Sequence, residues 1–323
     1  MGFLKKLFVL KKILIVSLAL LLIVGCSSTQ TSAPSGKTEY PAFEGGTSKL
    51  AFAAQKTIKD QYEIFVVDLT TKILSQLTTN GFADTSPGWS PDGQKIVYSS
   101  NVNGIYQLFT MKSDGSEQTQ LVISHTDDTQ PVWEPGLTGG IKIAYQSNGN
   151  GDLDIYIYNM IDKTSKAITG TDSQETQSAW SPDGQKIAFV SNNDGDFEIY
   201  VMGASGSNPL QLTKNEAYDS SPSWSPDGNQ IAFISKRSPD QHFQLFGMNA
   251  DGSQETQLTR SDFTTSSPTW STDGKTLAFV SESSQGSQIL ALDLTTKKLY
   301  IITSGFYDYT GLSWMKLPES PTP

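Results

Sequence analysis

Short apolar runs separated by polar turns recur along most of the chain. The clearest unit, residues 178–213, contains apolar runs at 187–190 and 199–202. The first run follows Ser-Pro-Asp-Gly, in which proline presets φ, aspartate binds its own backbone and glycine accepts a positive φ. Polar reversals follow at 192–195 and 203–206. This alternation predicts a four-stranded antiparallel meander.

The tryptophans show how often this unit recurs. All six occupy the same place in the repeat, at spacings of 44, 47, 44, 46 and 44 residues. Such a period with four strands per unit is typical of a β-propeller. We therefore predict an all-β fold with six blades of four antiparallel strands. The tryptophans could be ligand platforms, but one fixed position in every blade favours blade core. They are Trp89, Trp133, Trp180, Trp224, Trp270 and Trp314.

The two ends of the repeat predict how the ring closes. The first unit, from about Ser48, lacks a tryptophan strand, whereas the last tryptophan strand, residues 311–316, has no unit after it. We expect this C-terminal strand to join the first blade as its innermost strand, because closure protects sheet edges. The predicted propeller covers residues 47–317, and residues 318–323 are predicted to be a disordered tail.

The repeat resembles that of the TolB-like propellers, which are related to the WD-repeat class. The resemblance rests on Trp-Ser-Pro-Asp-Gly, then Ile-Ala-Phe, Ile-Tyr and Leu-Thr, as in residues 180–213. It covers nearly all of the chain after the N-terminal segment. It implies a propeller of the bacterial cell envelope that acts as a binding scaffold.

The N-terminus has the features of a lipoprotein leader. Four lysines precede the twelve-residue apolar run 13–24, which ends at Gly25 and Cys26. That run is short for a membrane span and fits a signal peptide. We predict a signal peptide at 1–25, lipid attachment with palmitate-type acyl chains at Cys26, and a flexible tether at 26–46. An uncleaved anchor, or an ordinary signal peptide with an incidental cysteine, is the alternative.

The net charge and the N-terminal leader limit the classes of partner that we expect. Without the leader the chain has 19 Lys and Arg against 33 Asp and Glu, a net charge of −14. This balance argues against nucleic acid and against electrostatic docking on anionic lipid. We therefore expect the lipid alone to hold the protein at the membrane, on the extracytoplasmic side. We also expect the protein to be a monomer. Ser27 follows the cysteine, which favours the outer membrane, facing the periplasm, in a Gram-negative cell.

The sequence offers little for catalysis. His125 and His242 are the only histidines, and no Gly-x-Ser-x-Gly motif is present. The metal site of oligogalacturonate lyases, whose repeat is similar, draws on more histidines than this. We predict a non-enzyme without a cofactor. Residues 148–154 and 192–198 resemble calcium loops weakly, but the repeat itself also explains their acidic residues.

One acidic pattern suggests a binding site. Acidic side chains stand five residues before four of the tryptophans, at Asp84, Asp128, Glu175 and Asp219, and Asp308 stands one place out of step. Each precedes an innermost strand, so we expect a carboxylate ring at the channel mouth, suited to a cation or to a ligand bearing Lys or Arg. Aspartates that only form turns are the alternative.

The sequence as a whole predicts a lipid-anchored, non-catalytic scaffold of the bacterial envelope. Its partner would be an envelope protein or peptide received at the channel mouth. An envelope enzyme acting there on a glycan or peptide, as a lyase, hydrolase or peptidase, is the alternative.

Overall fold

The computed structural model describes residues 49–315 apart from 103, 137–139, 238–241 and 284–285. Contacts divide the chain into residues 1–37 and 38–323, and all described residues belong to the second unit. The predicted signal peptide (1–25), the tether (26–46) with Cys26, and the tail (318–323) lie outside the described residues.

The described residues form six four-stranded antiparallel sheets, and these are the six predicted blades. Blade 1 contains β24 (Asp308–Trp314), β1 (Lys49–Gln55), β2 (Glu63–Asp68) and β3 (Leu74–Gln76). Blade 2 contains β4 (Asp84–Trp89), β5 (Lys95–Val102), β6 (Ile105–Lys112) and β7 (Thr119–Gln120). Blade 3 contains β8 (Asp128–Trp133), β9 (Lys142–Ser147), β10 (Asp154–Asn159) and β11 (Thr164–Ala167). Blade 4 contains β12 (Glu175–Trp180), β13 (Lys186–Ser191), β14 (Glu198–Gly203) and β15 (Leu210–Gln211). Blade 5 contains β16 (Asp219–Trp224), β17 (Gln230–Ser235), β18 (Gln244–Asn249) and β19 (Thr256–Gln257). Blade 6 contains β20 (Thr264–Trp270), β21 (Thr276–Ser283), β22 (Gly286–Asp293) and β23 (Leu299–Ser304).

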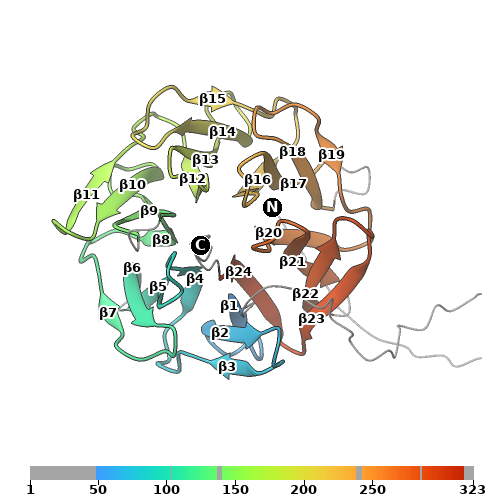
Figure 1. The fold of residues 1–323 in the computed structure, drawn as a ribbon. Helices are drawn as coiled ribbons and strands as arrows, with labels where there is room; N and C mark the ends of the chain where they lie inside the picture. The colour runs from blue at the N-terminus through green and yellow to red at the C-terminus, as the bar shows by residue number, and fades with distance from the viewer. Residues whose placement is uncertain (1–48, 103, 137–139, 238–241, 284–285, 316–323) are drawn as a thin grey trace, which may run out of the picture. The chain divides into compact units, whose positions relative to one another are not determined.

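The six sheets stand in a closed ring, with one innermost strand of each blade toward the centre (Figure 1). The last strand, β24, pairs antiparallel with β1, so the chain closes the ring by supplying the innermost strand of blade 1. The C-terminal closing strand is therefore confirmed. Each innermost strand also contacts the innermost strand of the next blade.

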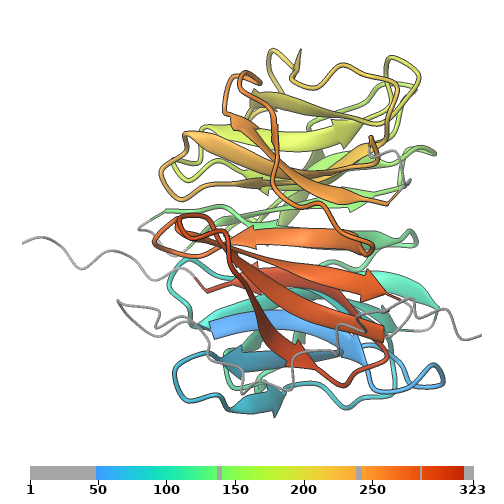
Figure 2. The same cartoon turned by 90° about the vertical axis from the view of Figure 1, so that its right-hand side faces the viewer.

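The connecting loops gather at the two ends of the strands (Figure 2). We call one end the turn face, because it carries the turn between the first and second strands of each blade, such as residues 90–94. We call the other the connection face, because it carries the link that leads into each innermost strand, such as residues 212–218. The loops between second and third strands also lie on the connection face, since neighbouring strands are antiparallel.

The hydrophobic core consists of six clusters, one between each pair of neighbouring blades. In β1, Leu50 and Phe52 pack toward blade 6, whereas Ala51 and Ala53 pack toward blade 2. This follows from the alternation of side chains along a strand, which buries both faces of every blade. All six tryptophans are at most 8% exposed and belong to these clusters, so their predicted core role is confirmed.

The Ser-Pro-Asp-Gly turns form as the sequence predicts. In blade 5, the Ser225 hydroxyl donates to Asp227 Oδ1 at 2.5 Å and accepts from the Gln230 amide at 2.9 Å. Gly228 has φ = 72°, a conformation that is costly for other residues. The Ser225 hydroxyl and the Asn229 amide hold the pKa of Asp227 below its usual value. The same serine and aspartate contacts recur in blades 2, 4 and 6.

Every innermost strand contains a β-bulge three residues before its tryptophan. The bulge residue has φ between 52° and 61° in all six blades, and the pairing register shifts at the same place. Five of these residues are not glycine, so the surrounding ring must stabilise a left-handed backbone that such residues rarely adopt. We call the six bulge residues, glycine included, the bulge ring. They are Ser86, Gln130, Gln177, Ser221, Ser267 and Gly311.

Candidate functional site: the central channel and the connection face

The central channel contains a cavity of about 450 Å³ at its turn-face end. The tryptophans of five blades line it, together with Pro91, Pro135 and Pro182, each of which lies two residues after the tryptophan of its blade. A second cavity of about 330 Å³ lies beside the bulge ring, toward the connection face. Both cavities share a belt of one residue from each blade. In five blades it is the residue after the bulge, and in blade 3 it is the second residue after it: Pro87, Val132, Ser178, Pro222, Pro268 and Leu312.

The channel lining is uncharged. Among the described residues that line the two cavities, none is Asp, Glu, Lys, Arg or His. From the connection face inward, the lining changes from serine and glutamine at the bulge ring to proline and leucine, and then to tryptophan edges and small side chains. Such a surface favours an uncharged extended chain, because a buried charge would have no partner there.

Hydrogen bonds between blades fix the channel lining. The Ser221 amide donates to Gln177 Oε1 of the preceding blade at 2.6 Å, and the Gly311 amide donates to Ser267 Oγ at 3.3 Å. Side chains of one bulge therefore support the backbone of the next. The contact at Ser221 helps to hold this non-glycine residue at positive φ.

The predicted carboxylate ring does not lie on the channel surface. Asp84, Asp128, Glu175 and Asp219 stand at the starts of innermost strands, as expected, but they are at most 2% exposed. Their carboxylates point into the blades, where side chains of the preceding connections donate to them. The donors are Asn80 at 2.8 Å, Ser124 at 2.8 Å, Thr171 at 2.9 Å and Asn215 at 2.9 Å, respectively.

The exposed position predicted for these four carboxylates is therefore corrected. Each carboxylate accepts hydrogen bonds from side chains of the connection that precedes it. This structural role is close to the alternative stated above, in which these acids only form turns. Asp308 is half-buried and accepts a hydrogen bond from the Tyr62 hydroxyl, whose pKa is raised first by burial and then by this aspartate. Partner binding by these five residues stays a prediction, and their burial does not favour it.

Sequence reasoning missed a second acidic position, at the start of the third strand of several blades. Burial, and the charge of Asp84 in the next blade, raise the pKa of Glu63. Burial raises the pKa of Glu198 to about 7, and the nearby Asp219 adds to this effect. The Thr213 hydroxyl and the Asn215 amide donate to Glu198. Carboxyl groups therefore meet between blades 1 and 2 and between blades 4 and 5, and all of them are buried except Glu63, which is half-buried.

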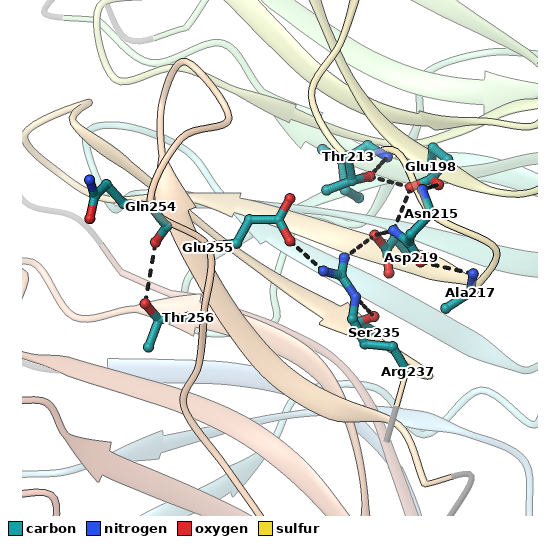
Figure 3. A network of polar contacts seen from close by, with 11 residues as sticks. Glu198, Thr213, Asn215, Ala217, Asp219, Ser235, Arg237, Gln254, Glu255 and Thr256 are labelled. Carbon is teal, nitrogen blue, oxygen red and sulfur yellow. Dashed lines mark hydrogen bonds and ion pairs between the residues drawn. The ribbon is translucent and has the colours of Figure 1, made fainter. Parts of the chain in front are cut away.

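Between blades 4 and 5, Arg237 completes the polar network (Figure 3). Its guanidinium pairs with Asp219 Oδ2 at 2.6 Å and with Glu255, and its Nε donates to Ser235 Oγ at 2.8 Å. The guanidinium also lies 4.9 Å from the centre of the Phe246 ring. Arg237 thereby balances the charge of Asp219, a residue that would otherwise be buried without a countercharge.

The exposed acids of the connection face lie one to four residues ahead of the buried ones. Asp127, Asp152, Asp172 and Asp194 are exposed, and all belong to loops of blades 2 to 4 or to the links between them. The six connection-face loops between Lys59 and Lys214 contain no Lys or Arg. The sector of the connection face formed by blades 2 to 4 is therefore acidic. Its charge comes from these exposed aspartates and not from the buried carboxylates of the predicted ring.

No metal centre emerges in the described part of the chain. His125 is exposed, whereas His242 is half-buried and lies 3.3 Å from Thr264 Oγ1 through its Nδ1. Within the described ranges, no three His, Cys, Asp or Glu side chains gather as metal ligands. The structure thus does not assemble the calcium-like loops 148–154 and 192–198 into such a group.

Six blades around an uncharged channel define a β-propeller, a fold that occurs with several unrelated functions. The sequence profile of the TolB beta propeller domain matches residues 17–138 and 137–314. The chain belongs to this family. No helix in the described ranges is long and apolar enough to cross a membrane.

The similarity to individual relatives covers only part of each chain. The "Tol-Pal system protein TolB" of Azoarcus sp. strain BH72 is 32% identical over 75 residues, which are 23% of this chain and 17% of that protein. The crystal structure of TolB from Acinetobacter baumannii is similar with a TM-score of 0.72 at 17% identity, covering 83% of this chain and 66% of that one. The chain thus spans less than two thirds of these relatives.

The same fold also occurs in an enzyme. The structure of oligogalacturonate lyase in complex with manganese is similar with a TM-score of 0.54 at 14% identity, covering 80% of this chain and 74% of that one. At this identity the likeness concerns the fold alone.

Proposed function

We propose that this protein is a non-catalytic scaffold that receives an extended, uncharged segment of a partner protein in its central channel. The uncharged lining of tryptophan, proline, serine and glutamine carries this proposal. Tryptophan and proline contact an extended chain over a large apolar area, while serine and glutamine offer hydrogen bonds to its backbone. A basic flank of the partner would meet the exposed Asp127, Asp152, Asp172 and Asp194.

A charge placed in the channel tests this function. Leu312 lines both cavities, so Leu312→Asp should lower partner capture from the organism's own envelope extract by about tenfold or more, since the ligand would bury an unpaired carboxylate. The exposed Leu210 on outer strand β15, changed to Asp, is the matched control and should capture normally. Quantitative mass spectrometry of the captured proteins gives the ratio.

Two outcomes of this experiment would contradict the proposed function. Equal capture by Leu312→Asp and Leu210→Asp would show that the partner does not use the channel. Turnover of an envelope glycan or peptide by the purified protein, lost in Leu312→Asp, would instead support the enzymatic alternative.

The same proposal places the protein in the bacterial cell envelope, held to a membrane by lipid on Cys26. The N-terminal lysines, the apolar run and the single cysteine at its end support this, and so does membership of a TolB-type family. In a Gram-negative cell Ser27 favours the outer membrane. Several acyl chains are enough for stable anchoring.

Cys26→Ser tests the anchor directly. Because no other cysteine is present, the variant should incorporate none of a clickable palmitate analogue and should leave the membrane fraction. Labelling of wild type and variant in the producing bacterium, followed by gel fluorescence, measures this. Equal label on both proteins would show that Cys26 is not the acceptor.

A further inference from the structure

One sector of the connection face departs from the repeat in a way that the propeller does not require. In blade 2, the Asn101 amide donates to the Ala83 carbonyl at 3.0 Å, just before Asp84. In blade 5 the same contact, also at 3.0 Å, joins Lys236 to Tyr218. Both blades thus make the same backbone contact, while the alanine and asparagine side chains of blade 2 are replaced in blade 5 by a tyrosine and a lysine.

Two phenylalanines complete this sector. The Tyr218 ring lies 4.9 Å from that of Phe197 and 5.7 Å from that of Phe243, measured between ring centres. Lys236 Nζ stands 5.5 Å from the centre of the Phe243 ring. Tyr218 is 39% exposed, whereas the two phenylalanines are half-buried beneath it. We call Phe197, Tyr218, Lys236 and Phe243 the aromatic–lysine patch.

The charge around this patch differs from that of the acidic sector of blades 2 to 4. After a stretch of six loops without a basic residue, Lys214, Lys236, Arg237 and Arg260 all lie on or beside blade 5, and they include both arginines of the chain. Arg237 is engaged by Asp219 and Glu255, but Lys214, Lys236 and Arg260 form no ion pair with the described residues. Exposed Glu216 and Asp262, together with Asp219 and Glu255, balance these four cations, so the surroundings of the patch are close to neutral, whereas the sector of blades 2 to 4 is acidic.

We propose that the aromatic–lysine patch binds an acidic peptide segment of a partner protein, anchored by one aromatic or aliphatic side chain. The anchor would pack on the exposed Tyr218 ring, and a neighbouring carboxylate would pair with the Lys236 ammonium group. Aromatic anchors beside a basic group commonly dominate the binding energy of a protein interface. The acidic sector of blades 2 to 4 would repel the same segment, so charge directs it to blade 5.

The ring geometry favours a peptide over a glycan. Sugars stack along aligned aromatic faces, but the Tyr218 ring is tilted by 50° against Phe197 and by 87° against Phe243. Among the three rings only Tyr218 is exposed, so the patch offers one contact surface rather than a platform for successive sugars. One anchor side chain fits this arrangement.

The repeat supplies a variant that should fold. Tyr218→Ala with Lys236→Asn gives blade 5 the side chains that blade 2 has at Ala83 and Asn101, on the same backbone contact. The probe is a fluorescein-labelled peptide, Asp-Glu-Gly-Phe-Gly-Glu-Asp, measured by fluorescence anisotropy in low salt. We expect the wild type to bind it and the double variant to bind it at least about tenfold more weakly. Gln174→Ala, at the place of Tyr218 in blade 4, should bind like the wild type.

Two further controls decide the interpretation. Leu312→Asp should bind this peptide normally, because the patch is separate from the channel; this distinguishes a failure here from a failure of the proposed function. A peptide with Asn and Gln in place of the acids should bind about tenfold more weakly. An unchanged dissociation constant for the double variant, equal binding of the neutral peptide, or preferential binding of a neutral oligosaccharide would overturn the proposal.

Discussion

Deleting residues 309–323 is expected to abolish cooperative folding of the propeller. The deletion removes nearly all of β24, including the pairing of Leu50 with Trp314 and of Ala54 with Tyr309. Trp314 and Tyr309 are 3% and 1% exposed within the cluster between blades 6 and 1. Removing one buried tryptophan alone costs about 3–5 kcal/mol, against a typical domain stability of about 5–15 kcal/mol.

The exposed edges add to this loss. Without β24, β1 has no partner on its inner side and the ring is open, so unpaired strand edges become available for association with other chains. Deleting only residues 318–323 is the matched control, since it leaves every described strand in place. Calorimetry and size-exclusion chromatography compare the two. A long deletion that melts at the same temperature as the short one would contradict the closing role of β24.

The fold could be predicted from the sequence because the repeat carries redundant information. Tryptophan spacing predicted six blades, the Ser-Pro-Asp-Gly turns predicted the hairpins, and the unmatched strand at residues 311–316 predicted the closure. Each signal depends only on alternation and turn chemistry, which are local properties. Six copies of a weak local signal then define one global arrangement.

The direction of the acidic side chains could not be predicted in the same way. A bulge with positive φ lies between each acid and its tryptophan, and its residue is serine or glutamine in five blades. Neither type signals a left-handed backbone, so simple alternation does not locate the bulge. The signal that was available is the proline that follows the bulge in four blades, at residues 87, 131, 222 and 268.

The carboxyl pairs between blades could not be predicted from the sequence either, because they depend on contacts between neighbouring repeats. Glu198 and Asp219 are 21 positions apart and meet only when blades 4 and 5 pack, with Asn215 donating to both. Tyr218 and Lys236 illustrate the opposite case. Their departure from the repeat is visible in the sequence, but the backbone contact that joins them is visible only in the structure.

Glu198→Gln is expected to stabilise the protein more at pH 8 than at pH 5. Burial raises the pKa of Glu198 in the folded state to about 7, above its ordinary value of 4.5. A raised carboxyl pKa means that the folded state prefers the protonated form. The stability associated with this group is therefore full below pH 4.5 and declines as pH rises through 7.

Glutamine removes this dependence because it stays neutral. One pKa unit corresponds to about 1.4 kcal/mol, and relaxation of the protein around a buried charge reduces its effect, so we expect a gain on the order of 1–2 kcal/mol between pH 5 and pH 8. Blade 5 shows that glutamine fits this position. There the Thr259 hydroxyl donates to Gln244 Oε1 at 3.0 Å, in the place of Thr213 and Glu198.

The reverse change supplies the control. Gln244→Glu puts a carboxyl group into the corresponding pocket of blade 5, where Gln244 Nε2 now donates to the Phe263 carbonyl at 2.9 Å. Its loss of stability should be larger at pH 8 than at pH 5, because a deprotonated carboxylate cannot donate and would lie against that carbonyl oxygen. Urea unfolding at both pH values measures the difference for each variant, and common effects of pH cancel when each is compared with the wild type. A stability difference between Glu198→Gln and wild type that is the same at pH 5 and pH 8 would show that Glu198 does not titrate in this range.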